Sequence, residues 1–313
     1  MNEVQRIERQ SELTIAKTVD YSTFNRFIEY LDASPKTIET YTKAVRQFFN
    51  YLALHGIVQP KREDILAFRD DLKLSGLKPT TVQNYITATR IFFKWTAQEG
   101  LYPNIAEHVK GAKLDKNHKK DYLTSRQAKE VLESIDRSTE AGKRDYAILS
   151  LMVTGGLRTV EVSRANIEDL RTVGENTVLF VQGKGREEKT EYIKISAPVE
   201  RAIRQYLKAR DNVEEGQPLF SSTSNNSKGK RITTRTISGI VKEALKNAGY
   251  DSARLTAHSL RHTAITLALL AGREITEVQQ FARHANLNTT MIYNHALDQA
   301  KNGCSDAITN AIF

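Results

Sequence analysis

The 313-residue sequence contains only one cysteine, Cys304. A single thiol cannot form an intramolecular disulfide, and it cannot supply a zinc site built from thiolates. Long apolar runs are also missing: stretches such as AILSLMV fall far short of the roughly 20 residues that span a bilayer, and the N-terminus MNEVQRIERQSELT lacks the apolar core of a secretion signal. We therefore expect a protein of the reducing cytoplasm with no membrane partner.

Several motifs of familiar enzyme chemistries are absent as well. The sequence has no Asp-x-Asp motif, no carboxylate cluster and no Gly-x-x-x-x-Gly-Lys loop. Metal-assisted hydrolysis and nucleotide hydrolysis therefore lack their usual parts. We expect neither a metal ion nor any other cofactor.

What is present is the composition of a globular protein, with 40% hydrophobic and 27% charged residues. The length suffices for two domains, each with its own core. A formal net charge of +9 suits a polyanionic partner such as nucleic acid. The excess charge is spread along the chain rather than collected in a tail, so on charge alone a merely basic protein is equally consistent.

Residues 1–20 form an N-terminal extension, and the helical signals that follow predict a domain over 21–110. The stretch from Ser34 to Gly56 begins with an N-cap serine and Pro35 at the first helical position. A second stretch, from Pro79, repeats it in register, with Tyr85 matching Tyr41 and a Phe-Phe pair in both. Either a helical unit is duplicated or two capped helices on one core have converged on the same pattern.

Residues 111–121 are polar, rich in lysine and without hydrophobic periodicity, which indicates an interdomain linker. Such a segment is either a solvated loop or a strap along a phosphate backbone. Beyond it, 122–313 read as helices interrupted by two alternating stretches, 176–182 and 190–196, which predict a half-buried hairpin. The expected fold is therefore mainly α with a small antiparallel sheet.

Several polar residues at suggestive spacings lie in this second part. Arg158 and Glu161 stand three apart, as do His258 and Arg261 in HSLRHT; in a helix such residues share a face. Taken alone, each favours a structural interpretation: a surface ion pair, a cap or a satisfied core residue.

A lysine stands at the turn of the predicted hairpin. Lys184 lies in GKGREEK, and its flanking glycines would let its ammonium group reach a substrate over the sheet. Arg186 and Lys189 are close enough that spacing alone does not choose among the three.

The combination of these residues with His284 and Tyr293 indicates phosphodiester chemistry. Two arginines, a lysine and two histidines converging on one site would clamp a single phosphodiester, with the arginines gripping its nonbridging oxygens. A tyrosine hydroxyl would supply a nucleophile that leaves a covalent phosphotyrosine.

The ordered set resembles the active site of the tyrosine recombinases, also called phage-type integrases. The resemblance rests on T-G-x-x-R-x-x-E, a lysine in a β-hairpin turn, H-x-L-R-H-T and H-x8-Y, and it covers nearly the whole chain. It implies a SAM-like core-binding domain over 21–110 and a mixed α/β catalytic domain over 122–313. The chain before residue 21 is too short for the additional arm-binding domain of larger integrases. The resemblance therefore implies the two-domain form without that domain.

The resemblance also implies a role for each residue. Arg158 and Arg261 would bind the scissile phosphate and Tyr293 would attack it. Lys184 would protonate the departing 5′-hydroxyl, and His258 would assist proton transfer at the tyrosine. The remaining two residues, His284 and Glu161, would respectively hydrogen-bond a phosphate oxygen and support the arginines.

The sequence departs from the family pattern at two places. Ala282-Arg283 replaces the usual Leu-Gly before the second histidine, and Gly155 replaces a threonine before the first arginine. The C-terminal tail, 297–313, either packs on its own domain or, as in the family, docks on a neighbouring protomer. Its apolar residues are Ala307, Ile308, Ala311, Ile312 and Phe313.

We therefore expect a site-specific recombinase of double-stranded DNA that assembles as a tetramer on two sites and integrates or excises a mobile element. Alternatives are the resolution of plasmid or chromosome dimers, a topoisomerase-like relaxation of DNA, and a non-catalytic DNA-binding regulator. An accessory protein would control direction. The candidates for DNA contact on the two similar helices are Thr37, Lys43, Arg46, Thr81, Thr87 and Arg90.

Overall fold

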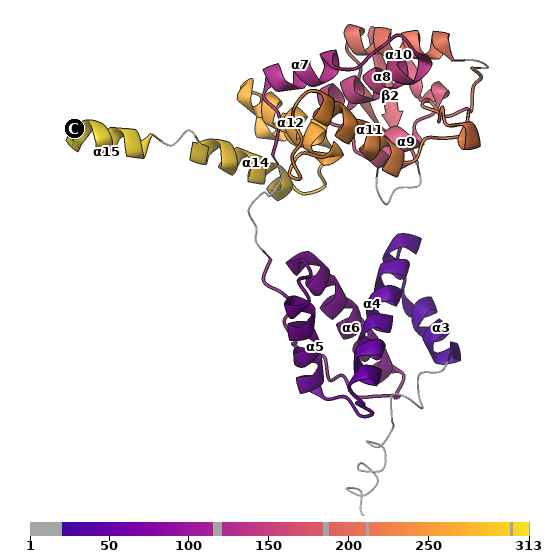
Figure 1. Ribbon diagram of the computed structural model, residues 1–313, viewed down its shortest axis with the longest axis vertical. Helices are drawn as coiled ribbons and strands as arrows, with labels where there is room; N and C mark the ends of the chain where they lie inside the picture. The colour runs from indigo at the N-terminus through magenta and orange to yellow at the C-terminus, as the bar shows by residue number, and fades with distance from the viewer. Residues whose placement is uncertain (1–20, 115–120, 184–187, 211–212, 301–302, 313) are drawn as a thin grey trace, which may run out of the picture. The chain divides into compact units, whose positions relative to one another are not determined.

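A computed structural model describes residues 21–114, 121–183, 188–210, 213–300 and 303–312. The chain divides into two compact units, 1–116 and 117–313, each with its own hydrophobic core. Both are built mainly from helices, and a small sheet lies in the second, as expected from the sequence (Figure 1). No helix of the described ranges is long and apolar enough to cross a bilayer.

The first unit consists of the helices α3 (Tyr21–Tyr30), α4 (Pro35–Leu54), α5 (Arg62–Leu74) and α6 (Pro79–Gln98). The predicted start of α4 is confirmed, because Ser34 is the N-cap and its hydroxyl accepts from the Thr37 N–H. The two similar helices, α4 and α6, pack against each other. Their repeated phenylalanines face one another, with ring centroids 5.8 Å apart for Phe48 and Phe93 and 5.3 Å for Phe49 and Phe92.

The second unit contains a longer series of elements. In chain order they are α7 (Ser125–Glu133), α8 (Glu140–Gly155), α9 (Thr159–Arg164), η1 (Ile167–Asp169), β1 (Leu170–Val173), β2 (Asn176–Val181), β3 (Glu191–Lys194), α10 (Ala197–Ala209), η2 (Asn225–Ser227), α11 (Thr234–Asn247), α12 (Ala257–Leu270), α13 (Ile275–Ala282), α14 (Leu287–Ala300) and α15 (Cys304–Ile312).

The predicted hairpin is present as β2 and β3, which pair antiparallel with Leu179 opposite Ile193. The sheet also has an edge strand that the sequence did not reveal, β1, so its order is β1-β2-β3. The residues of β1 are half-buried or exposed throughout, and a strand with no buried face gives no period-two hydrophobic signal.

The helix α8 forms the centre of the second core, because α7, α10 and α12 all pack against it (Figure 1). Its residues from Ala147 to Val153 are all buried, including Leu151 and Met152. A helix that is apolar on every side is typical of the inside of a domain. The buried end of this helix, at Gly155 and Gly156, fixes the place where the candidate functional residues begin.

Candidate active site

The candidate site starts where α8 stops. Gly156 follows the helix in the left-handed conformation, with φ +59°, which glycine adopts without the steric cost that a Cβ brings. The replaced position, Gly155, is the last helical residue, and an added Cβ there would lie 2.6 Å from Cδ1 of Ile193 on β3. The turn therefore falls at Gly156, and Gly155 allows the sheet to pack closely against α8.

Arg158 lies just outside the next helix. It is the N-cap of α9, with extended backbone angles, rather than a residue inside the helix as the spacing suggested. Glu161 still pairs with it, because a capping arrangement also brings the N-cap and the third helical residue together. The carboxylate of Glu161 accepts from the Arg158 backbone N–H and from its Nη1, both at 2.8 Å.

Glu161 is fully buried and serves a second arginine, Arg283, whose Nη2 donates to it at 3.1 Å. Burial by itself would raise the pKa of Glu161, but Arg283 and Arg158 outweigh that effect and hold the pKa below its ordinary value. Glu161 is therefore an anion that orients two cations.

Arg261 projects from the first half of α12 and is 1% exposed. Its Nη1 donates to the Gly156 carbonyl and its Nη2 to the Ala282 carbonyl. Burial and the neighbouring guanidinium of Arg158 lower its pKa to about 10, so it remains a cation at neutral pH. These two bonds tie α12 to the ends of α8 and α13.

His284 follows α13 directly. The Arg283 N–H bonds the Gln280 carbonyl and the His284 N–H bonds the Gln279 carbonyl, which is the Schellman pattern of helix ends. Burial and the positive charge of Arg261 lower the pKa of His284 to about 4. Its ring is therefore neutral at pH 7, and its Nδ1 lies 2.9 Å from the Thr290 hydroxyl.

Tyr293 lies on α14 and is 7% exposed. Its ring centroid is 4.9 Å from that of His262 and 6.3 Å from that of His284. Burial raises the pKa of Tyr293 to about 12 although Arg261 and Arg158 oppose the shift. The phenol is therefore protonated at neutral pH.

His258 lies at the solvent-exposed side of the site. It is exposed in the first turn of α12, and its ring centroid lies 4.5 Å from that of His262. A cavity of about 530 Å³ is lined by His258 together with Arg158, Ser238, Lys242 and Thr256. The two sequence candidates, His258 and Arg158, therefore face one opening.

The lysine of the hairpin is the one candidate that the structure leaves open, because Lys184 and Arg186 lie outside the described residues. Lys189, the third alternative, pairs with the buried Asp169, so its ammonium group already has a structural partner. Arg164 of α9 donates to the Gly183 carbonyl at 3.1 Å, which anchors the chain just before the turn.

The DNA-contact candidates of the first unit occupy two kinds of environment. Lys43, Arg46 and Arg90 are exposed, and the Arg46 guanidinium lies 5.2 Å from the Phe24 ring centroid. The three threonines, Thr37, Thr81 and Thr87, are half-buried. The exposed cations are thus better placed than the threonines to reach a partner.

Two residues belong to the site although sequence reasoning gave them no role. His262 contacts both His258 and Tyr293 through its ring, and its signal was its place one helical turn after His258 in HSLRHT. In the sequence Arg283 stands out only as a departure from the glycine of the family pattern. Its side chain points into the protein and contacts Glu161 and Gly156, and no spacing rule predicts that direction.

Both units of the chain match known protein families. Residues 121–300 match the phage integrase family, and residues 24–100 match the phage integrase N-terminal SAM-like domain. A tyrosine recombinase of Synechocystis sp. is 28% identical over 296 residues, which is 89% of this chain and 92% of that protein. Tyrosine recombinase XerC of Caldanaerobacter subterraneus is 35% identical over 198 residues, 62% of this chain.

The match spans only 52% of the length of that XerC and 64% of a tyrosine recombinase of Synechococcus elongatus. Among solved structures, XerH recombinase bound to a palindromic difH substrate aligns with a TM-score of 0.72 at 20% identity, covering 98% of this chain and 90% of that one. A lambda integrase dimer bound to a core site aligns with a TM-score of 0.70 at 16% identity, covering 93% and 79%. At these identities the likeness establishes the fold.

The catalytic family match covers more than half of the sequence, and the N-terminal match accounts for most of the first unit. The chain belongs to the phage integrase family, the family of the tyrosine recombinases.

Proposed function

We propose that the protein is a site-specific recombinase that cuts and rejoins double-stranded DNA through a 3′-phosphotyrosine at Tyr293. The observation that carries the proposal is the convergence of Arg158, Arg261, His284 and Tyr293 from α9, α12, the end of α13 and α14. Arg158 and Arg283 share the Glu161 carboxylate, and Arg283 and Arg261 share the Gly156 carbonyl. The ring centroids of His284 and Tyr293 are 6.3 Å apart, and we infer that one phosphate reaches all four groups.

The chemistry follows from the properties of these groups. Arg158 and Arg261 bind the nonbridging oxygens and neutralise the charge that develops at phosphorus. Arg261 uses two N–H groups for the carbonyls of Gly156 and Ala282, and a guanidinium has five N–H donors in all. Its remaining donors serve the phosphate.

His284 contributes a further hydrogen bond. We assign the Thr290 hydroxyl as the donor in its hydrogen bond with Nδ1. The neutral ring then carries its proton on Nε2 and donates it to a phosphate oxygen. A neutral donor suits this position because two arginines already supply the positive charge.

In the cleavage step the Tyr293 oxygen forms a bond to phosphorus and the bond from phosphorus to the 5′-oxygen breaks. The phenol proton passes to His258, and Lys184 donates a proton to the departing 5′-oxygen. A 5′-hydroxyl of the partner duplex then reverses the step. Since one phosphodiester replaces another, the exchange is nearly isoenergetic and needs neither ATP nor a metal ion.

The raised pKa of Tyr293 limits its reactivity before DNA binds. A phenol with a pKa of about 12 is a poor nucleophile at pH 7 until a base is positioned beside it. We infer that DNA completes the site by bringing the phosphate against the arginines and excluding water. Hydrolysis by water and attack of Tyr293 on unrelated esters are thereby suppressed.

The proposal extends to the domains and the assembly. We propose that a core-binding domain, 21–110, and a catalytic domain, 122–313, each contact the duplex and are joined by the linker 111–121. Lys43, Arg46 and Arg90 would contact phosphates or base edges. A tetramer on two sites would exchange strands in pairs in the cytoplasm, with an accessory protein controlling direction.

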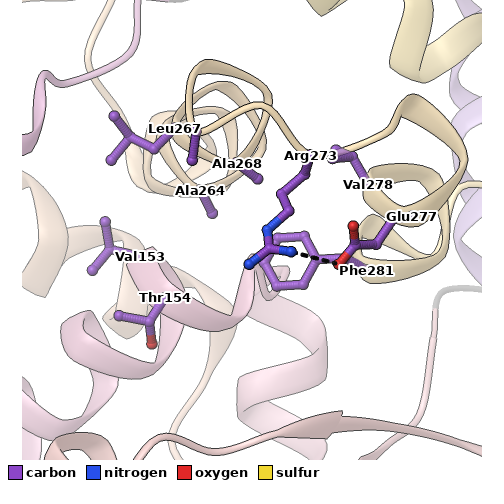
Figure 2. Close-up of a pocket in the computed structure, with 10 residues that line it drawn as sticks. Val153, Thr154, Ala264, Leu267, Ala268, Arg273, Glu277, Val278 and Phe281 are labelled. Atoms are coloured by element: carbon purple, nitrogen blue, oxygen red, sulfur yellow. Dashed lines mark ion pairs between the residues drawn. The ribbon is translucent and has the colours of Figure 1, made fainter.

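An apolar cavity of about 380 Å³ is the proposed acceptor of the C-terminal tail (Figure 2). Figure 2 shows its wall, in which Val153 of α8, Leu267 of α12 and Phe281 of α13 surround the space. An ion pair of Arg273 with Glu277, at 3.9 Å, stands at its side.

The matching apolar surface lies on α15. Ile308 and Ile312 are 59% and 67% exposed, while Phe313 lies outside the described residues. A helix with an uncovered apolar face gains by packing into such a cavity. We propose that the α15 of one protomer occupies the α8–α12–α13 cavity of its neighbour.

The experiment that tests the function uses the DNA that flanks the gene. Purified protein is incubated with that DNA in EDTA, denatured in SDS and examined for a covalent adduct by gel and by peptide mass. We expect an adduct at Tyr293 that is absent from Tyr293→Phe, while both proteins bind the DNA equally.

Binding without any adduct would refute the recombinase and favour the non-catalytic regulator. An adduct whose rejoining needs no second site would instead favour relaxation of DNA in the manner of a topoisomerase. The location of the cleaved DNA site then distinguishes the two recombination roles. A site at the end of a mobile element would support integration and excision, whereas a site elsewhere in a plasmid or chromosome would support dimer resolution.

A further inference from the structure

Arg283 adopts a backbone conformation that is unusual for a residue other than glycine. It caps α13 at φ +54° and ψ +46°, and His108 is the only other non-glycine residue with positive φ in the described ranges. For a residue with a Cβ this conformation costs on the order of 1–2 kcal/mol. A residue that accepts such a cost is expected to be held by compensating contacts.

The compensating contacts are all made by the guanidinium. Nη1 donates to the Phe281 carbonyl at 2.8 Å, and Nη2 donates to the Gly156 carbonyl at 3.2 Å and to Glu161 at 3.1 Å. The side chain is only 4% exposed. Arg283 therefore cannot lie along a DNA backbone as an ordinary surface arginine does.

The contact of Arg283 with Glu161 affects the charge that Arg158 can offer to a phosphate. If Arg158 were the only cation on this carboxylate, the charge of Arg158 would be largely spent on Glu161 rather than on a phosphate. Arg283 supplies the second cation and does so from the interior, while the side chain of Arg158 remains 30% exposed toward the opening. The buried Arg283 thus neutralises Glu161, and the more exposed Arg158 keeps its charge available at the opening.

We propose that Arg283 is a positioning residue for the recombination reaction: it neutralises and fixes Glu161, so that Arg158 is held in place by that carboxylate while its charge stays available for the scissile phosphate. This inference rests on the proposed function. It assigns to Arg283 an action through Glu161 and no contact with DNA.

Arg283 also couples two parts of the site. Through its Schellman position it sets the direction in which the chain leaves α13 toward His284, and through its side chain it holds Gly156 and Glu161. A glycine would give the same turn without strain, but of the two ion pairs described for Glu161 it would leave only the one with Arg158. The substitution Arg283→Gly therefore keeps the turn and removes only the charge beside Glu161.

The test is a double-mutant cycle on the rate of covalent adduct formation, measured in a single turnover on the flanking duplex that the wild-type protein cleaves. Arg283→Met, which keeps an apolar stem, and Arg283→Gly, which relieves the backbone, should both slow adduct formation by about 10- to 100-fold, the range that a charge-assisted hydrogen bond supports. Their affinity for the duplex should change less than about threefold, since Arg283 does not touch it.

The cycle is completed by Glu161→Gln and the double variant Glu161→Gln/Arg283→Met. If Arg283 acts through Glu161, the double variant forms the adduct no more than about twofold more slowly than Glu161→Gln alone. Arg283→Lys keeps the charge but not the fork of donors, and should recover part of the rate.

Two results would overturn the inference: adduct formation by Arg283→Met and Arg283→Gly at the wild-type rate, or an equal loss from Arg283→Met with and without Glu161→Gln. A purely structural role predicts that the rate falls only in variants whose melting temperature falls, and that Arg283→Gly is normal. If the wild-type protein itself forms no adduct, the proposed function fails. The same cycle on the melting temperature then decides the Arg283–Glu161 coupling, and additive losses there would sink it.

Discussion

The burial of Glu161 makes a strong prediction for the stability of the second unit. The carboxylate is 0% exposed and accepts from the Arg158 backbone, the Arg158 guanidinium and the Arg283 guanidinium. Glu161→Gln preserves shape and one acceptor oxygen but removes the charge. It leaves Arg283, which is 4% exposed, with no anion among its described contacts.

The expected magnitude follows from these contacts. Removing one partner of a buried ion pair costs about 3–5 kcal/mol. Losing two charge-assisted hydrogen bonds at about 1.5–3 kcal/mol each gives about 3–6 kcal/mol, which overlaps that range. For a unit of this size each kcal/mol lowers the melting temperature by roughly 2–4 °C. We therefore expect a fall of roughly 6–20 °C in the transition of the catalytic unit.

Thermal unfolding of the full chain, followed by calorimetry, checks this value. Glu133→Gln is the matched control, because Glu133 pairs with Lys129 on the surface, with side chains 63% and 75% exposed. Exposed pairs contribute at most about 1 kcal/mol, so the control should hardly move the transition. A loss below about 1 kcal/mol for Glu161→Gln would refute the assignment of Glu161 as a buried counterion of two arginines.

Three further predictions test other parts of the structure. His284 has a folded pKa of about 4 against about 6.5 unfolded; its contribution is complete above pH 6.5 and is lost as the pH falls toward 4, by at most about 3 kcal/mol. Urea unfolding at several pH values should therefore show a shallower slope in that window for His284→Asn. Phe48→Ala should cost the first unit about 3–5 kcal/mol, whereas Leu54→Ala, at a position 82% exposed, should change it by less than about 0.5 kcal/mol in the same assay. Ile308→Asp should leave the melting temperature of the monomer unchanged and weaken its assembly on DNA in gel-shift titrations; unchanged assembly would exclude the tail docking.

Local signals were sufficient to predict most of the fold. The capped start of α4 and its repeat at α6 follow from Ser34 and the prolines, and β2 and β3 follow from alternating side chains. The edge strand β1 could not be predicted, because its partner β2 supplies the hydrogen bonds and its own side chains bury no face. Pairing with a neighbour is a tertiary property that a single stretch of sequence does not encode.

For the candidate site, sequence reasoning identified residue types and order but not their connections. The spacing of Arg158 and Glu161 predicted their pairing, although through a helix face rather than through the cap that forms. Arg283 could be recognised only as a departure from glycine. Its inward direction depends on a carboxylate 122 positions earlier in the chain, and no periodicity connects two such residues.

The charge balance of the site explains why it is poised for an anion. Arg158, Arg261 and Arg283 gather around one carboxylate, Glu161, so the cluster has more positive than negative charge before any substrate arrives. Burial lowers the pKa of His284 and of Arg261, and the surplus of positive charge lowers both pKa values further. An added negative charge would oppose the part that comes from repulsion. In the proposed reaction the scissile phosphate would supply that charge and offset the repulsion among the guanidinium groups. Relief of this repulsion would then favour binding of the phosphate at the place where we propose that Tyr293 attacks.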